Sequence, residues 1–246
     1  MMKKAIVVGA SSGIGREVAL ALLAEGWQVG LMARRESAMQ ELAQAYPGKV
    51  EVMVCDITMQ NAPQQLLQLV DKMGGVYLYV HAAGIGKAGE ALDVTVETQT
   101  LQTNVMAFAN LIDTIYVYMA SHHGGHIVAI SSIAGTKGMG IAPSYSASKG
   151  FQQLYLQALE QKSRANGDHI YVTDIRPGFV DTALIAGRAY PMKMEASKVA
   201  HGIMKAIEQR KSSVVIDWRY RCLVGLWRCL PNALWRRMPV GWLRKK

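Results

Sequence analysis

Tyr145 and Lys149 lie four residues apart in the run PSYSASKGF, residues 143–151, which otherwise holds mostly small residues. If this run is helical, the two side chains lie on one face and can approach the same point in space. A fixed ammonium favours the charged form of a nearby phenol and lowers its pKa from about 10. Tyr145 is therefore a candidate general acid or base, and the alternative is an ordinary ring beside a solvated lysine.

A second chemical motif is the glycine-rich run GASSGIG, residues 9–15, which follows a strand-like segment and opens a helical one. Glycines allow a tight turn and close approach of the backbone to a ligand. The N-terminus of the following helix offers free N–H groups and a positive dipole end, which suit a pyrophosphate. This context predicts a dinucleotide site, and the alternative is a glycine-rich turn without a ligand.

Arg34 and Arg35 follow the second predicted strand. An acidic residue at this place would hydrogen-bond the ribose 2′-hydroxyl of NAD. Two guanidinium groups instead suit a 2′-phosphate, because their planar forks pair with phosphate oxygens. The pair favours NADP(H) as the cofactor, against the alternative of two solvated arginines in a loop.

The elements that must position these motifs are short apolar segments that alternate with longer helical patterns. Near-continuous apolar strands separated by helices are typical of a parallel sheet covered on both faces. The 246 residues, 50% hydrophobic and 18% charged, suffice for one such domain. We predict an α/β fold with a doubly wound, parallel, seven-stranded sheet of the Rossmann type. The predicted strands are residues 4–10, 27–33, 49–55, 76–82, 126–132, 170–176 and 212–216.

With these motifs the sequence resembles the short-chain dehydrogenase/reductase family, in its classical subgroup, over residues 3–216. The family's pattern Gly-x-x-x-Gly-x-Gly is matched by Gly9, Gly13 and Gly15. The composition changes near residue 217. We therefore expect a dinucleotide-binding and catalytic domain at residues 1–216 and an amphipathic, basic extension at residues 217–246.

The family's active site is a tetrad of Asn, Ser, Tyr and Lys, and the resemblance places it on Asn104, Ser132, Tyr145 and Lys149. The family's serine precedes its tyrosine by thirteen residues, and this count selects Ser132 over its neighbour Ser131. The resemblance implies that Tyr145 protonates a substrate carbonyl oxygen that Ser132 holds. It also implies that Lys149 binds the nicotinamide ribose and lowers the tyrosine pKa, while Asn104 anchors a water that relays protons to Lys149.

The same resemblance assigns cofactor contacts along the chain. The adenine would meet Asp56, the adenosine ribose would meet Ala83 and Gly84, and the nicotinamide carboxamide would meet the segment after the sixth strand. The expected cofactor-binding residues are Gly9, Ser11, Ser12, Gly13, Ile14, Gly15, Arg34, Arg35, Asp56, Ile57, Ala83, Gly84, Tyr145, Lys149, Pro177, Gly178, Val180 and Thr182.

One departure from the family pattern follows the fourth strand, where HAAG stands in place of the usual Asn-Asn-Ala-Gly. His81 and Ala82 replace both asparagines. The second family asparagine is mainly structural, so the departure concerns the stability of this strand more than catalysis.

Neither the histidines nor the cysteines indicate a metal site. His122, His123 and His126 have no carboxylate or cysteine beside them, and we expect surface histidines and no catalytic metal. The three cysteines have no metal-ligand or disulfide spacing, which suits a reducing compartment. The sequence has no uninterrupted apolar run of about 18 residues, and its first strand begins too early for a signal peptide, so we expect a cytoplasmic location.

Two loops beside the predicted catalytic residues, 134–143 and 183–195, carry information on the substrate. Both are apolar, and they contain Met139, Met192 and Met194. Methionines form an adaptable apolar wall, which predicts a hydrophobic carbonyl substrate. The alternative is ordinary packing of a mobile lid.

Together these features predict an NADPH-dependent oxidoreductase that reduces a ketone or aldehyde to an alcohol, with Tyr145 as the general acid. One alternative is a non-enzymatic NADP-binding sensor or scaffold, against which the complete tetrad counts. Another is an alcohol dehydrogenase that works in the oxidising direction. The family resemblance also suggests a homodimer or a homotetramer.

The last thirty residues, 217–246, hold eight Lys or Arg, one acid and four of the five tryptophans. They account for +7 of the net charge of +9 and leave +2 for residues 1–216, so we expect no nucleic-acid partner. Apolar residues recur at helical spacing, with interruptions at Pro231 and Pro239. The pattern predicts helices that lie in a membrane interface without crossing it, and the alternative is packing on the body or on a second subunit.

Overall fold

The sheet at the centre of the protein has seven strands, all of them parallel. The computed structural model describes residues 3–89, 91–185 and 190–238 of the chain. Each strand overlaps one of the seven predicted segments, so the predicted Rossmann-type sheet is confirmed. In sheet order the strands are β3 (Val50–Val54), β2 (Gln28–Ala33), β1 (Lys4–Val8), β4 (Leu78–His81), β5 (Gly125–Ile130), β6 (Ile170–Arg176) and β9 (Ser213–Val215).

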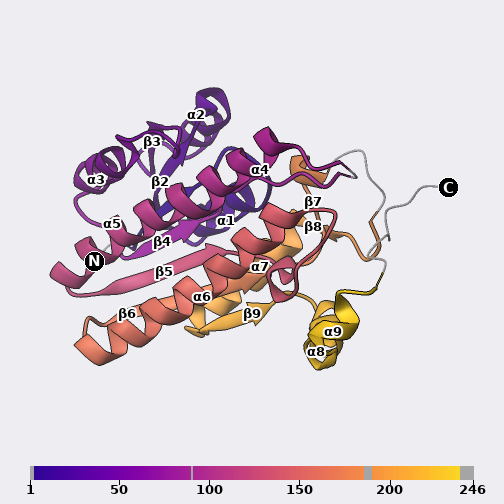
Figure 1. The fold of residues 1–246 in the computed structure, drawn as a ribbon. Coiled ribbons are helices and arrows are strands. Elements are labelled where there is room, and N and C mark those ends of the chain that lie inside the picture. Colours follow the sequence, from indigo (N-terminus) through magenta and orange to yellow (C-terminus); the bar gives the residue numbers. More distant parts are fainter. Residues whose placement is uncertain (1–2, 90, 186–189, 239–246) are drawn as a thin grey trace.

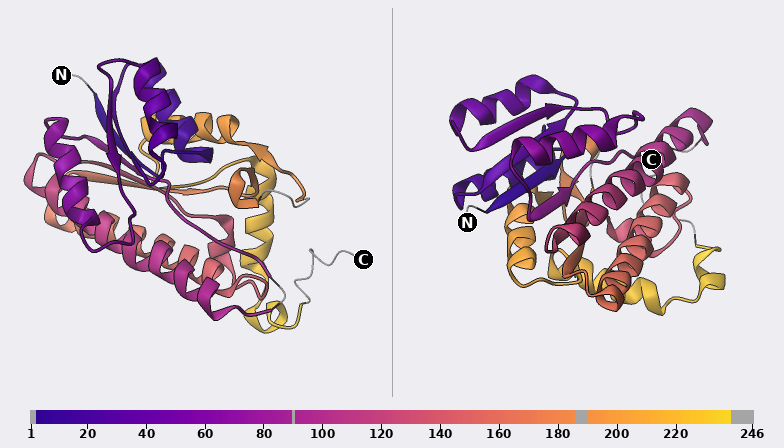
Figure 2. Two further views of the ribbon diagram at one scale, coloured as in Figure 1. Left: turned by 90° about the horizontal axis from the view of Figure 1, so that it is seen from above. Right: turned by 90° about the vertical axis from the view of Figure 1, so that its left-hand side faces the viewer.

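Helices cover both faces of this sheet, as the apolar strands predict. Strands β4 and β5 are buried along their whole length, because neither of their faces meets solvent. In Figure 1 the helices α5 and α6 cross the front of the sheet, and Figure 2 shows the sheet between its two helical layers. One layer consists of α1 (Gly13–Ala24), α2 (Glu36–Ala45) and α7 (Ala196–Glu208), and the other of α3 (Ala62–Lys72), α5 (Phe108–Ser121) and α6 (Pro143–Asn166).

The order of the strands reverses at β1, which pairs with β2 on one side and with β4 on the other. The connections that follow β1 and β4 therefore leave toward opposite faces, and a crevice opens at the carboxyl ends of the strands. Short elements complete this end of the molecule. They are the helix α4 (Val94–Leu101), the π-helical turn η1 (Gln102–Ala107), the 3-10 turns η2 (Ile133–Thr136) and η3 (Ala183–Ile185), and the strand pair β7 (Val180–Asp181) and β8 (Met194–Glu195).

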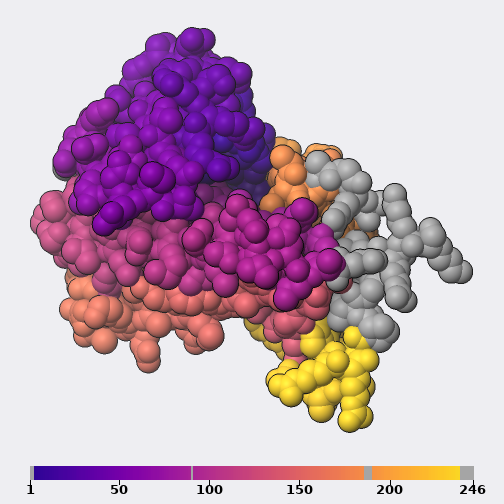
Figure 3. All heavy atoms as spheres, turned by 45° about the horizontal axis from the view of Figure 1, so that its top comes forward, coloured from indigo at the N-terminus to yellow at the C-terminus, as the bar shows by residue number. Residues whose placement is uncertain are grey.

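The C-terminal extension, residues 217–246, is described as far as residue 238 and forms α8 (Trp218–Cys229) and α9 (Asn232–Trp235). Figure 3 shows it as a lobe at one end of the molecule. Tyr220, Val224, Trp227 and Trp235 are buried in the same hydrophobic core as α1 and α7. The described part of the extension therefore packs on the body of the protein, which was the alternative to the membrane prediction.

The opposite face of α8 is open to solvent. Trp218 and Leu226 are each 66% exposed on this face. Among the residues that the structure describes, no helix is long and apolar enough to cross a membrane. Helix α8 thus packs one apolar face on the body of the protein and exposes further apolar side chains on its other face.

The prediction that all three clustered histidines lie on the surface is wrong for His126. Its side chain is 1% exposed, and its Nε2 lies 2.8 Å from Thr173 Oγ1 on the next strand. Burial lowers the pKa of His126 to about 4, so the ring is neutral at neutral pH. The residue belongs to the predicted strand 126–132, and β5 is buried along its whole length, so its side chain lies inside the protein rather than in a surface turn. His122 and His123 are exposed, as expected.

His81, which replaces a family asparagine, is buried at the end of β4. Its Nδ1 lies 3.0 Å from the Tyr79 hydroxyl, and its ring meets the Phe108 ring edge-on at 5.0 Å. Burial lowers the pKa of His81 to about 3, which keeps the ring uncharged. The strand retains its pairing with β1 and β5, so the departure from the family pattern is accommodated as core packing.

Candidate active site

A cleft of about 1050 Å³ lies at the carboxyl ends of the strands. Its wall contains Ser132, Tyr145 and Lys149 together with every residue that the sequence assigns to the cofactor. The sequence-predicted residues, which are spread from position 9 to position 182, are thus brought to one continuous surface. Asn104 does not line the cleft, because it is fully buried behind the wall.

The glycine turn after β1 has the geometry that a dinucleotide needs. Gly9 has a φ of +86°, and a Cβ there would lie 2.6 Å from the backbone nitrogen of Ala83, so only glycine fits. The helix α1 then begins at Gly13, and its N-cap residue Ser12 makes no side-chain capping hydrogen bond. The N–H groups of the first turn are therefore not covered by this side chain and suit a pyrophosphate.

Two arginines, Arg34 and Arg35, follow β2 and stand beside the glycine turn. The Arg35 guanidinium donates to Ser11 Oγ at 3.2 and 3.3 Å from its two nitrogens. The Arg34 side chain is 72% exposed, and its Nη1 lies 3.9 Å from Asp56 Oδ2. A hydrogen bond from the Thr58 backbone N–H is the main reason why the pKa of Asp56 is lowered. An exposed ion pair of this length is weak, so the Arg34 guanidinium is available to a phosphate.

Tyr145 and Lys149 lie one turn apart on α6, as their spacing predicts. Lys149 Nζ is 5.9 Å from the centroid of the Tyr145 ring. Burial raises the pKa of Tyr145, and a hydrogen bond with Ser132 acts in the opposite direction. The resemblance implies a pKa lowered by Lys149. The structure gives the other direction, because the loss of solvation of the phenolate outweighs the effect of its polar neighbours.

The Lys149 ammonium lies inside the protein, with its side chain 4% exposed. Its Nζ donates to the carbonyl oxygen of Ile130 and to Gln152 Oε1, each at 2.9 Å. Burial lowers the pKa of Lys149 to about 8, and the carboxylate of Asp174 opposes this shift. The group therefore remains largely charged at neutral pH.

Asn104 supports the site from the π-helical turn η1, a rare type of turn that is frequent at functional sites. Its Oδ1 accepts from the Ile85 N–H at 2.9 Å, and its Nδ2 donates to the Ile85 carbonyl oxygen at 2.7 Å. The same Nδ2 lies 3.1 Å from Ser148 Oγ. Asn104 thus fixes the backbone after Gly84, which lines the cleft, and acts as a positioning residue.

Sequence reasoning missed Gln152, which spans the space between two members of the predicted tetrad. Its Nε2 donates to the Asn104 carbonyl oxygen at 2.9 Å, while its Oε1 accepts from Lys149. The resemblance places a relay water between these two residues. A carboxamide has no readily ionised proton, so Gln152 holds the ammonium in place rather than passing protons.

Sequence reasoning also missed a charged network beneath the site. Ser131 Oγ donates to Asp174 Oδ1, and Arg176 Nε donates to Asp174 Oδ2 at 2.6 Å. Ser131 and Ser132 both line the cleft, but this network uses the Ser131 hydroxyl, whereas the Ser132 side chain hydrogen-bonds with Tyr145. The sequence feature that could have revealed this network is the pair of charged residues, Asp174 and Arg176, at alternate positions of a strand that is otherwise uncharged.

The substrate side of the cleft agrees only in part with the sequence prediction. Met139 and Met192 line it, as expected. Met194 instead packs in the hydrophobic core, because β8 turns it away from the cleft. Residues 186–189 of the second predicted loop lie outside the described residues. Unpredicted aromatic side chains, Tyr190 and Trp227 among them, complete the wall.

Comparison with known proteins shows the family to which the chain belongs. The sequence pattern of the short chain dehydrogenase family matches residues 3–190. An uncharacterized oxidoreductase of Myxococcus xanthus is 33% identical over 240 residues, which cover 94% of each chain.

Solved structures show the same fold. A short chain dehydrogenase/reductase from Burkholderia phymatum in complex with NAD has a TM-score of 0.83 at 22% identity, over 92% of each chain. A variant of the actinorhodin polyketide ketoreductase with NADPH has a TM-score of 0.77 at 23% identity, over 87% of this chain and 95% of its own. On the family match, the long alignment to the Myxococcus relative and the cleft itself, the chain belongs to the short-chain dehydrogenase family and is an oxidoreductase.

Proposed function

We propose that the protein is an NADPH-dependent reductase that converts a hydrophobic ketone or aldehyde to an alcohol. The observation that supports this most strongly is the shared cleft. Ser132, Tyr145 and Lys149 line one part of it, and the glycine turn with Arg34 lines another. A proton donor and a dinucleotide cradle on one wall are what reduction of a carbonyl requires. In this proposal residues 1–216 carry both the cofactor site and the catalytic residues.

The cofactor would supply a hydride from its nicotinamide ring to the carbonyl carbon. The Ser132 hydroxyl would donate a hydrogen bond to the carbonyl oxygen, and Tyr145 would transfer its phenolic proton to that oxygen. Because burial raises the pKa of Tyr145, the phenol is protonated at neutral pH and is available as an acid. After the product leaves, the Tyr145 phenolate would recover its proton from solvent water that enters the open cleft.

Lys149 would act on both the cofactor and the tyrosine. An ammonium has three donors, and two of those on Lys149 are taken by Ile130 and Gln152, which leaves one for the nicotinamide ribose. The charge would also stabilise the Tyr145 phenolate that proton transfer leaves behind. Asn104 would support both steps by fixing the backbone at residue 85.

The choice of NADPH over NADH rests on the residues after β2. Similar folds bind either cofactor, since one solved structure holds NAD and another holds NADPH. In this chain the available side chains are the guanidinium groups of Arg34 and Arg35, both on the wall of the cleft. Their planar, positively charged groups pair with phosphate oxygens and therefore favour the 2′-phosphate of NADPH.

Two alternatives use the same cleft. A non-enzymatic sensor or scaffold would bind NADP without turning over a substrate, and an alcohol dehydrogenase would use Tyr145 as a base in the oxidising direction. Assays of NADPH oxidation and of NADP⁺ reduction, with ketones, aldehydes and alcohols of increasing chain length, distinguish these functions from the proposed one.

We also propose a homodimer or homotetramer in the cytoplasm. Met106, Val117 and Leu154 are 61%, 68% and 70% exposed on η1, α5 and α6, and such apolar side chains support a subunit contact. Light scattering measures the mass of the protein in solution and so gives its number of subunits.

A peripheral membrane contact is proposed for the outer face of the extension, where Trp218 and Leu226 are exposed beside arginines.

The first prediction concerns Tyr145. Tyr145→Phe should lower kcat by about 10²-fold to 10⁴-fold or more, because it removes the transferred proton and little packing. The affinity for NADPH should stay within about tenfold. Tyr155→Phe is the control on the same helix, since its hydroxyl bonds Asp113 outside the cleft. Normal turnover by Tyr145→Phe would remove Tyr145 from the proposed role.

The second prediction concerns the cofactor. Arg34→Asp should weaken NADPH binding by about 10-fold to 100-fold and leave NADH binding nearly unchanged, because it replaces a phosphate partner with a repelling charge. Titration of both cofactors into the protein measures this. Arg164→Asp, on an exposed stretch of α6, controls for the change in net charge. Equal affinity of the wild type for NADH and NADPH would contradict the assignment.

The third prediction concerns the outer face of α8. The double variant Trp218→Ser, Leu226→Ser should lose co-sedimentation with vesicles that contain anionic lipid, because it removes the apolar side chains exposed there. Binding of the wild type should weaken as salt is added. Leu92→Ser is the control for an exposed apolar residue that lies outside both the extension and the proposed subunit contact. A wild-type protein that stays in the supernatant at low salt would end the membrane proposal.

A further inference from the structure

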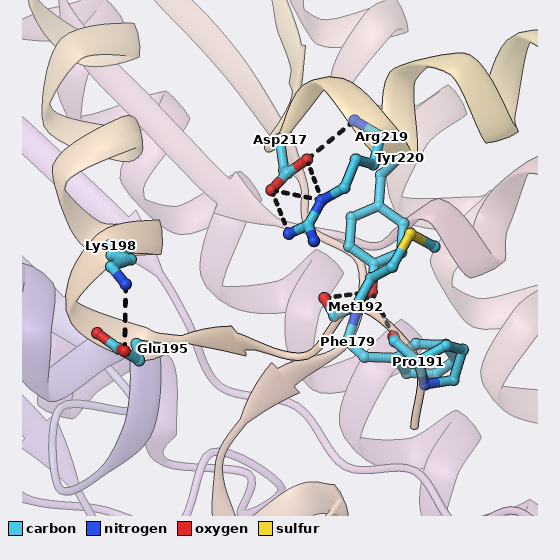
Figure 4. Close-up of polar contacts among 8 residues, drawn as sticks. All are labelled: Phe179, Pro191, Met192, Glu195, Lys198, Asp217, Arg219 and Tyr220. Carbon is cyan, nitrogen blue, oxygen red and sulfur yellow. Dashed lines mark hydrogen bonds and ion pairs between the residues drawn. The ribbon is translucent and has the colours of Figure 1, made fainter. Parts of the chain in front are cut away.

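Tyr220, on the inner face of α8, joins the extension to the backbone of the site. Its ring is fully buried against Gly178, where a Cβ would lie 2.2 Å from the ring. Its hydroxyl accepts from the Phe179 N–H at 3.1 Å. The same hydroxyl directs its single proton toward two carbonyl oxygens, that of Met192 at 3.0 Å and that of Pro191 at 3.2 Å (Figure 4). Tyr220 thus ties together two segments that both line the cleft.

The first turn of α8 is held in place by an ion pair between Asp217 and Arg219. Asp217 accepts from the Arg219 N–H at 2.9 Å, and the Arg219 guanidinium donates to the same carboxylate at 2.7 Å (Figure 4). Hydrogen bonds from Arg219 lower the pKa of Asp217 and keep it charged. The helix therefore leaves the sheet directly after β9 in a fixed direction, with Tyr220 aimed at the loop after β6.

Further along the extension, three apolar side chains reach the cleft itself. Leu223 and Trp227 from α8, and Trp235 from α9, line it together with Tyr145 and Met139. The two indole rings meet edge-on, with centroids 5.5 Å apart. Because Trp227 and Trp235 are only 7% and 8% exposed, packing holds both rings rigidly, and each presents a small apolar part of its surface to the cleft.

The helix α9 is also attached to the loop that connects Ser132 with Tyr145. Trp235 Nε1 donates to the Gly138 carbonyl oxygen at 2.8 Å. Lys137 Nζ donates to the Leu230 carbonyl oxygen at 3.0 Å and to Asn232 Oδ1 at 2.6 Å. The extension therefore contacts the loops on both sides of the proposed proton donor.

We propose that the C-terminal extension forms the substrate-side wall of the active site, and that Trp227 and Trp235 set the size of the hydrophobic group a carbonyl substrate carries. This inference rests on the proposed reductase function and names its substrate class as ketones or aldehydes with a flat apolar group. A rigid indole wall selects substrates by the shape of their apolar group. A group that is too large cannot displace the rings, and one that is too small leaves them uncovered. Tyr220 is a positioning residue for this wall.

The test compares two tryptophans on the same helix. Trp227→Ala removes an indole from the cleft, and Trp218→Ala removes one that is 66% exposed on the outer face. For aryl methyl ketones with one and two rings, Trp227→Ala should raise kcat/KM for the larger ketone relative to the smaller by about tenfold or more. Trp218→Ala should leave this ratio within about twofold, and both variants should bind NADPH as the wild type does. Equal ratios in the two variants would overturn the proposal.

A second measurement uses no cofactor and milder substitutions. An aromatic ketone bound against the wall should quench tryptophan emission in the wild type and in Trp218→Phe, and much less in the double variant Trp227→Phe, Trp235→Phe. Saturable quenching that is unchanged in the double variant would overturn the proposal even if Trp227→Ala fails to fold. If the wild type reduces no ketone but shows this pattern of quenching, the reductase function fails while the binding wall stands.

Discussion

Lys149 holds an ammonium group where little solvent reaches it, and such a charge is costly unless hydrogen-bond acceptors surround it. The Ile130 carbonyl, at the end of β5, and the Gln152 side chain, one turn further along α6, provide these acceptors. The end of β5 and the first turns of α6 must therefore meet at this nitrogen. Ser132 lies two residues after Ile130 and Tyr145 precedes Lys149 by one turn, so both are brought to the cleft by the same contact.

The neighbouring elements are linked to this charge by further hydrogen bonds. Gln152 also donates to the Asn104 carbonyl, and Asn104 in turn fixes the backbone at Ile85, which lines the cleft. Asp174, held by Ser131 and Arg176, raises the pKa of Lys149 against the effect of burial. Strands β5 and β6, helix α6 and the turn η1 thus form one polar network around a single buried ammonium.

The strands, the glycine turn and the pairing of Tyr145 with Lys149 were predictable, because each leaves a local pattern: a short apolar run, a group of glycines or helical spacing. The role of Gln152 was not predictable, since in the sequence it is an ordinary helical residue and its partner Asn104 is 48 positions away. The extension was ambiguous for another reason. Trp218 and Trp227 both follow an apolar pattern, yet Trp218 faces solvent and Trp227 lines the cleft. Helical periodicity alone does not show whether an apolar face contacts protein or lipid.

The titration of the Lys149 side-chain nitrogen tests this account most directly. Nitrogen-15 NMR of the lysine ammonium groups, with Lys149→Met to assign the signal, gives its pKa in the folded protein. We expect a midpoint of about 8, well below that of the exposed lysines, and a lower one still in Gln152→Leu, which removes an acceptor of the charged form. A midpoint at the ordinary value for lysine, about 10.4, would contradict the claim that the site is built around a buried charge.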